Sequence, residues 1–304
     1  MGFILDTRNK IMEPDYIRLR EIKPVLAGYI RRSRSLLKRS AVPDENTVHD
    51  VRVLMKKCRA VLRLIDSQVI SEFVEKDIIA FREVGRIMSQ WRDTSVHRKT
   101  LRELRKEFPD IFTSLQEIDK INSLLEKSDT GEEPLPEMKE DLGKIDDLLE
   151  KAGYRIRFQS MSSIDPQLLL KELETTYMKV VDCYIRSRND PKPGKLHEFR
   201  KRVKDFLYQL YFFRPLNVPV IKTLEKKVNG IAQNLGKYND MTQLIKALEY
   251  KYPDSNKSHA LDELVIKIRE RQDRYLLKVW PQAYKIFCPG QSLVNVLGFK
   301  LLVI

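Results

Sequence analysis

The stretch TVHDVRVLMKKCRAVLRLI, residues 47–65, combines a regular apolar pattern with an unusual charge pattern. Its apolar side chains recur at alternating spacings of three and four, as in a helix that buries one face: Val48, Val51, Met55, Cys58, Leu62 and Ile65. One position further along, a second row holds a histidine and four cations: His49, Arg52, Lys56, Arg59 and Arg63. The stretch therefore predicts a helix with a basic row directly beside its core face.

This basic row lacks the acidic partners that usually accompany cations on a solvated helix. Solvated helices pair bases with acids three or four residues away, whereas Asp50 is the only acid between residues 47 and 65. Cations that repel one another in a row cost stability unless an anion neutralises them. The row therefore favours an anion-binding surface over a merely solvated polar face, which remains the alternative for such a helix taken alone.

The same pattern returns 148 residues later in the chain. VHDVRVLMKKCR (48–59) and LHEFRKRVKDFL (196–207) share a histidine, an arginine three residues after it and a lysine seven residues after it. Two further pairs keep the order at offsets of 147 and 155 residues: MSQWRD (88–93) with LGKYND (235–240), and YIRRSR (29–34) with YIRSR (184–188). These matches predict an internal duplication and two similar helical bundles about a pseudo-twofold axis.

Most of the 304 residues have helical periodicity, and no convincing strand pattern lies between turn signals. We therefore predict an all-α protein. Thr47 is the expected N-cap of the motif helix, with Asp50 placed as in a capping box. The predicted helices span about 15–40, 47–66, 71–92, 94–107, 111–127, 137–151, 167–188, 195–213, 218–237, 240–250 and 258–286.

Charge is sorted along the chain as well as in excess. The formal net charge is +13, which argues for a nucleic acid, an acidic membrane or another polyanion as partner. Residues 110–151 hold 13 acids and 5 bases, so they form an acidic segment between two basic parts. We predict a first half at 1–150, which includes this acidic linker, and a second half at 151–304.

The sequence argues against secretion and against a membrane span. Its three cysteines, Cys58, Cys183 and Cys288, form no CxxC pair, which fits a reducing compartment. No signal-like segment and no apolar run of roughly 18 residues is present. We expect a cytoplasmic protein whose apolar end, SLVNVLGFKLLVI (292–304), docks on the rest.

Metal binding and catalysis are not expected either. His49 and His197 are each followed by arginine and lysine, a field that repels a divalent cation, and no acid or cysteine cluster completes a ligand set. GIAQNLGKY (230–238) resembles a phosphate loop, but it has five residues between its glycines where four are needed, and Tyr238 replaces serine or threonine. With no activated nucleophile in view, we predict no enzyme activity, no metal and no cofactor.

At these residues the sequence resembles the CHAD domain (conserved histidine α-helical domain) family over roughly residues 15–285. The resemblance is carried by RIMSQWRD (86–93), by LGKYND (235–240) and by the motif residues His49, Arg52, Lys56, Lys57, Arg59, His197, Arg200, Lys204 and Tyr208. It implies two four-helix bundles that face each other across a basic groove or pore and bind inorganic polyphosphate. Leu207 and Asp205 stand where bases are common, so the second half is expected to bind more weakly.

The predicted partner is therefore inorganic polyphosphate, with polyphosphate granules as a location that such binding would allow. A flexible polyanion without bases needs only ordered rows of cationic donors. The alternatives are an RNA-binding module, which would favour aromatic side chains among the bases, and an accessory subunit of a polyphosphate or triphosphate phosphohydrolase. The predicted binding residues are Arg31, Arg34, His49, Arg52, Lys56, Lys57, Arg59, Arg63, Arg86, Arg92, His197, Arg200, Lys201, Lys204, Tyr208 and Lys237.

Two aspartates at matching positions admit two interpretations. Asp93 and Asp240 are each the last residue of a repeated motif. They are expected to cap the helices 94–107 and 240–250; the alternative is that they orient cationic donors at the floor of the groove.

Overall fold

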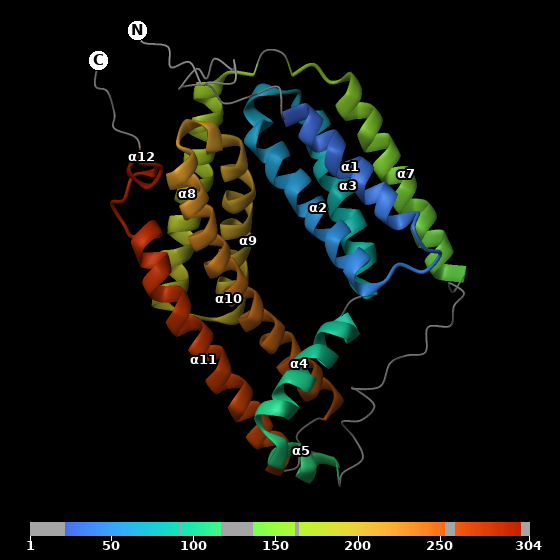
Figure 1. Ribbon diagram of the computed structural model, residues 1–304, viewed down its shortest axis with the longest axis vertical. Helices are drawn as coiled ribbons and strands as arrows, with labels where there is room; N and C mark the ends of the chain where they lie inside the picture. Colours follow the sequence, from blue (N-terminus) through green and yellow to red (C-terminus); the bar gives the residue numbers. More distant parts are fainter. Residues whose placement is uncertain (1–21, 92, 117–135, 162–163, 253–258, 299–304) are drawn as a thin grey trace, which may run out of the picture.

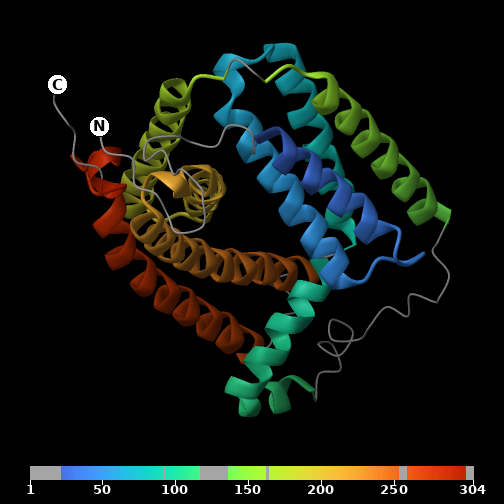
Figure 2. The same ribbon diagram turned by 45° about the horizontal axis from the view of Figure 1, so that its top comes forward.

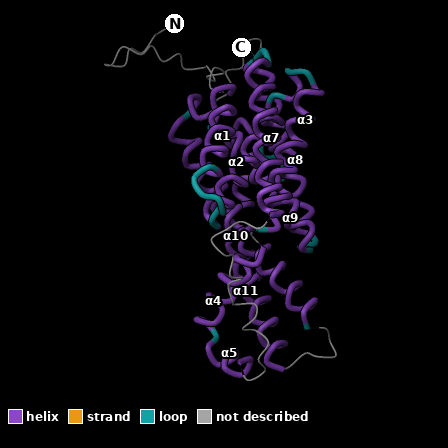
Figure 3. Tube along the Cα trace, turned by 90° about the vertical axis from the view of Figure 1, so that its right-hand side faces the viewer, coloured by secondary structure: helices purple, strands orange, loops and turns teal. Residues whose placement is uncertain are grey.

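The computed structural model describes residues 22–91, 93–116, 136–161, 164–252 and 259–298. Within these ranges it contains helices, turns and loops and no β-strand (Figure 3), so the all-α prediction is confirmed. The elements are α1 (Ile22–Leu37), α2 (Glu45–Leu64), η2 (Asp66–Gln68), α3 (Ser71–Gln90), α4 (Asp93–Glu107), α5 (Pro109–Gln116), α7 (Pro136–Phe158), α8 (Pro166–Asn189), α9 (Pro193–Leu210), η3 (Tyr211–Leu216), α10 (Val218–Lys251), α11 (His259–Phe287) and α12 (Leu293–Val296).

Helices α1, α2, α3 and α7 form one four-helix bundle, on the right in Figure 1. Its centre is the apolar row of α2 predicted above, where Val51, Met55 and Cys58 are at most 1% exposed. Two ion pairs fasten α7 to its neighbours. Arg34 of α1 donates to Asp146 at 2.6 Å, and Arg155 donates to the buried Asp77 of α3 at 2.7 Å.

Helices α8, α9, α10 and α11 form a second four-helix bundle, on the left in Figure 1. Its core is aromatic: the ring of Phe287 lies 5.9 Å from that of Tyr177 and 6.0 Å from that of Phe206. The Tyr177 hydroxyl donates to the carbonyl of Ile286 at 2.7 Å, which satisfies its one buried polar atom. Leu293 and Leu297 are buried, so the C-terminal segment docks as predicted up to residue 298.

Helices α4 and α5 leave the first bundle and pack against the far ends of α10 and α11 (Figures 1 and 2). Ion pairs hold them there: Glu107 of α4 accepts from Arg271 at 3.0 Å and from Arg274 at 2.9 Å. The chain therefore crosses to the second bundle before α7 returns to the first. The predicted division at residue 150 falls inside α7, and both this division and the internal duplication stay predictions.

The prediction of two helices at 218–237 and 240–250 was wrong, because α10 is continuous from Val218 to Lys251. The apolar period runs through the supposed break: Leu235, Tyr238 and Met241 are all buried. Burial of this face outweighs the modest preference of Asn239 and Asp240 for turns. Asp240 therefore lies within a helix and cannot be its N-cap. Asp93 is the first residue of α4, and its side chain lies outside the described part of the structure.

The start of α2 also differs from the prediction. The N-cap is Asp44, whose carboxylate accepts a hydrogen bond from the backbone N–H of Thr47 at 2.7 Å. Thr47 is thus the third helical residue, and Asp50 lies beyond the first turn. An aspartate caps at least as well as a threonine, so the helix begins at the earlier residue. The register of the apolar and basic rows is unaffected by this shift.

Candidate anion-binding site between the two bundles

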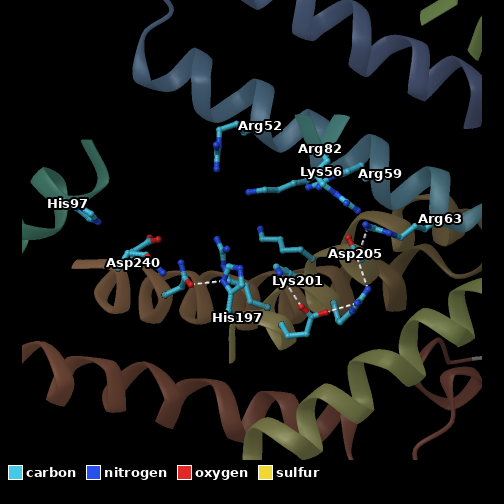
Figure 4. A pocket seen from close by; sticks show the side chains of 16 residues that line it. Arg52, Lys56, Arg59, Arg63, Arg82, His97, His197, Lys201, Asp205 and Asp240 are labelled. Atoms are coloured by element: carbon cyan, nitrogen blue, oxygen red, sulfur yellow. Dashed lines mark hydrogen bonds and ion pairs between the residues drawn. The ribbon is translucent and has the colours of Figure 1, made fainter. Parts of the chain in front are cut away.

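A pocket of about 630 Å³ lies where α2 of the first bundle faces α9 of the second (Figure 4). Further walls come from α3, α4 and α10. Nine arginines and lysines line it against three carboxylates, so a multivalent anion would be attracted. The lining residues are Arg52, Lys56, Arg59, Arg63, Arg82, His97, His197, Glu198, Arg200, Lys201, Arg202, Lys204, Asp205, Asn239, Asp240 and Gln243.

The basic row of α2 forms one wall of the pocket, because the helix buries the adjacent apolar row in its bundle. Arg52 is anchored on α3, where its Nη1 donates to the carbonyl of Gly85 at 2.7 Å and also contacts the hydroxyl of Ser89. Burial, and then repulsion from Arg63, lowers the pKa of Arg59. Arg52 is therefore held in place before any ligand arrives, which reduces the entropy cost of binding.

The corresponding row of α9 forms the facing wall. The guanidinium of Arg200 lies close to Gly236 of α10: a Cβ at that glycine would come within 3.3 Å of Nε and 3.4 Å of Nη2. Lys204 lies further along the row. Burial, repulsion from Arg200 and repulsion from Lys57 lower its pKa to about 8. A side chain at position 236 would therefore press on the guanidinium of Arg200.

His197 is oriented by a residue on α10. Its Nδ1 lies 2.8 Å from Oδ1 of Asn239. Because an amide oxygen only accepts hydrogen bonds, Nδ1 carries the proton of the neutral ring and Nε2 is unprotonated. Burial lowers the pKa of His197, and the Asn239 hydrogen bond opposes this effect. The ring is thus fixed but can take up a second proton when an anion lies nearby.

Two of the three carboxylates are engaged by arginines within the pocket. Asp205 of α9 accepts from Arg63 of α2 at 3.0 Å, and Glu198 pairs with Arg202 at 2.7 Å. Figure 4 places Arg63 and Asp205 at one end of the pocket and His97 and Asp240 at the other. The carboxylates therefore neutralise part of the field and leave the cations in excess.

The structure brings together eight of the predicted binding residues in this pocket. They are Arg52, Lys56, Arg59, Arg63, His197, Arg200, Lys201 and Lys204. All eight belong to the two motif helices, and all but Lys201 directly follow a buried residue of the apolar row.

The other predicted residues lie elsewhere or outside the described residues. Arg34 pairs with Asp146, Arg86 with Glu83 at 2.8 Å, and the ammonium of Lys237 lies 5.7 Å from the ring of Tyr275. Lys57 lies over the rings of Tyr29 and Tyr208, at 5.5 and 5.9 Å. Three positions complete the set: Arg31 and His49 are exposed outside the pocket lining, and Arg92 is outside the described part of the chain.

Several lining residues were not predicted from the sequence. Arg82 and His97 come from α3 and α4, and Asn239 and Gln243 come from α10, whereas Asp240 lines the pocket where one interpretation of the sequence had placed it. No periodicity marks them, because they enter through tertiary packing. Arg202 could have been found, since it lies between Lys201 and Lys204 in the motif itself.

The described residues include no group of histidine, cysteine, aspartate and glutamate arranged to hold a metal ion. Within the same ranges, no helix is long and apolar enough to cross a membrane.

Comparisons with known proteins agree with this architecture. The family model for the CHAD domain matches residues 29–249, and the chain therefore belongs to the CHAD domain family. The crystal structure of the CHAD domain from the plant Ricinus communis is similar in fold, with 15% sequence identity and a TM-score of 0.54 over 92% of this chain and 91% of that one. A search of curated proteins gave no match.

Proposed function

We propose that this chain binds inorganic polyphosphate, without chemical conversion, in the pocket between α2 and α9. The observation that carries the proposal is the opposition of two cationic rows from different bundles around about 630 Å³. A linear polyanion carries charge along its whole length and could contact both rows at once. Each charge-assisted hydrogen bond in such a site contributes roughly 1.5–3 kcal/mol before solvent screening.

The aromatic residues near the pocket favour polyphosphate over RNA. The ring of Tyr208 has Lys57 at 5.9 Å and Lys204 at 5.6 Å, and the ring of Tyr211 has Arg214 at 4.9 Å. These rings are thus occupied by cations of the protein itself. A single-stranded nucleic acid would need open rings on which its bases could stack.

We further propose that the protein is not an enzyme. Two of the three pocket carboxylates, Asp205 and Glu198, pair with arginines, and the described residues offer no group arranged to hold a catalytic metal ion. A role beside a separate phosphohydrolase is compatible with such binding. A cytoplasmic location on polyphosphate granules would follow from the same affinity.

The test is a binding titration of labelled long-chain polyphosphate. Replacing Arg59 and Lys204 by glutamine should weaken binding at least tenfold, since two pocket cations are lost. The matched control replaces Lys222 and Lys226 by glutamine; these lysines are exposed on α10 outside the pocket, and the same charge loss there should change affinity little. Affinity should also fall steeply with salt.

Two outcomes would contradict the proposal. RNA that competes as well as polyphosphate at equal phosphate concentration would favour a nucleic-acid function. Phosphate release from polyphosphate or triphosphate with magnesium, lost in the pocket variant and kept in the control, would establish an enzyme.

A further inference from the structure

Lys204 has an unusual environment for a lysine. Its ammonium group lies 5.6 Å from the ring of Tyr208 and faces two other cations, Arg200 on its own helix and Lys57 from α2. No described residue forms a hydrogen bond or ion pair with it. By contrast Lys201, one turn earlier in the same pocket, pairs with Glu198 at 3.4 Å and has an exposed side chain.

We propose that Lys204 is an acylation site, and that small acyl phosphates entering the pocket are the acyl donors. The pocket would hold the phosphate group of such a molecule against the arginines beside Lys204. An acyl phosphate held in this way would have its carbonyl carbon near Nζ of Lys204. Binding would thus raise the local concentration of the acyl donor beside the amine.

The chemistry requires a neutral amine, which the surroundings supply. The pKa of Lys204 is lowered to about 8, by burial first and then by Arg200 and Lys57. At pH 7.5 about a quarter of its side chains would be uncharged, against roughly 0.1% of ordinary lysines. The lone pair of Nζ attacks the carbonyl, a C–N bond forms and the C–O bond to phosphate breaks. Inorganic phosphate leaves with the electron pair, and the amine proton passes to it or to water.

Acylation would change what the pocket can bind. The amide is uncharged, so one of the facing cations and its contact with the Tyr208 ring are lost. This consequence rests on the proposed function: an acylated chain should bind polyphosphate several-fold more weakly. Because the concentration of the acyl phosphate sets the rate of modification, polyphosphate binding would respond to that concentration.

The experiment exposes the purified full-length protein to acetyl phosphate at pH 7.5 and follows each lysine by peptide mass spectrometry. Lys204 should be acetylated at least tenfold faster than Lys201, which sees the same local concentration of anions. Acetic anhydride, which carries no phosphate, should give a smaller preference for Lys204. Inorganic polyphosphate or pyrophosphate should protect Lys204 from acetyl phosphate. The rate should rise with pH and level off above about 8.

Acetylation of Lys204 no faster than that of Lys201 would overturn the proposal. The replacement Arg200→Gln tests whether this arginine holds the phosphate group of the donor. It removes both a phosphate contact and a repelling charge, so the preference for acetyl phosphate over acetic anhydride should shrink. The labelling measurement needs no polyphosphate. Its failure therefore leaves the proposed binding function standing, and the absence of polyphosphate binding would leave the labelling result standing.

Discussion

Arg63 of α2 donates a hydrogen bond to Asp205 of α9 at 3.0 Å, and this contact joins the two bundles at one end of the pocket. A second link lies one turn away, where the buried amide of Gln209 donates to the backbone carbonyl of Ala60 at 2.9 Å. The side chain of Asp205 is only 15% exposed, so its charge is well shielded from solvent. The pocket is therefore closed at this end by polar contacts between bundles.

Replacing Asp205 by asparagine should lower stability and strengthen binding. The change removes a largely buried carboxylate that offsets Arg63 and Arg202, so these cations would repel each other. The free energy of unfolding should fall by about 1–3 kcal/mol without ligand. Polyphosphate should raise the melting temperature of this variant more than that of the parent protein. An equal rise in both would mean that Asp205 does not oppose anion binding.

Polyphosphate affinity should fall at alkaline pH because of Lys204. Its pKa in the free protein is lowered to about 8, and a bound polyanion must raise it. Binding above pH 8 therefore takes up a proton, and affinity should fall by up to tenfold for each pH unit. A titration between pH 7 and 10 measures this slope. Lys204→Arg keeps the charge throughout and should flatten the curve; an unchanged slope would assign the titration to another group.

His197 should produce a second pH dependence on the acid side. Its pKa in the free protein is lowered from 6.5, so it is neutral at pH 7, and an anion near the ring favours the charged form. Affinity should therefore rise as pH falls from 7 towards the lowered pKa. Stability without ligand should fall over the same window, because the unfolded chain takes up the proton first. Calorimetry below pH 7 in buffers of different ionisation heat should detect proton uptake on binding, and His197→Gln should reduce this uptake.

Gly236→Ala should weaken binding without weakening the fold. The new Cβ would come within 3.3 Å of Arg200 Nε, so the guanidinium would have to shift from its position on the pocket wall. Alanine within a helix otherwise stabilises by about 0.5–1 kcal/mol over glycine. We expect several-fold weaker polyphosphate binding at an equal or higher melting temperature. The control is Gly143→Ala on α7, where a Cβ meets nothing within 4 Å, and affinity should not change.

Leu207→Arg should destabilise the second bundle and not tighten binding. Leu207 stands where the family resemblance expects a base. In the structure Leu207 is half-buried against the core and does not line the pocket. A guanidinium there would cost roughly 1–3 kcal/mol. Tighter binding at an unchanged melting temperature would contradict this placement.

The sequence predicted the two motif helices and their facing rows well, because the register between a buried and a basic row is a local property. Val51 and Arg52 fix it on α2, as Phe199 and Arg200 do on α9. What the sequence could not supply was the neighbour of each row. Arg82, His97 and Asn239 come from other helices, and only packing brings them to the pocket.

The sequence could not show that Asp205 offsets cations of both rows. It was expected to weaken the second half, and it does lie 3.9 Å from Arg202 of α9, but its hydrogen bond comes from Arg63 of the first half. The prediction that the halves bind unequally stays a prediction, but its basis changes, because the carboxylate offsets a cation on the opposite helix. Such pairs depend on the docking of two bundles and leave no trace in the spacing of residues along either helix.

Because the walls of the pocket belong to different bundles, a bound chain would touch both and could leave only by releasing its contacts one after another. Free polyphosphate could occupy each cation as it is vacated, before the departing chain recaptures it. Dissociation would then accelerate with the concentration of competing chains. The pocket between α2 and α9 would thus exchange one bound polyanion for another much faster than it would release a polyanion without replacement.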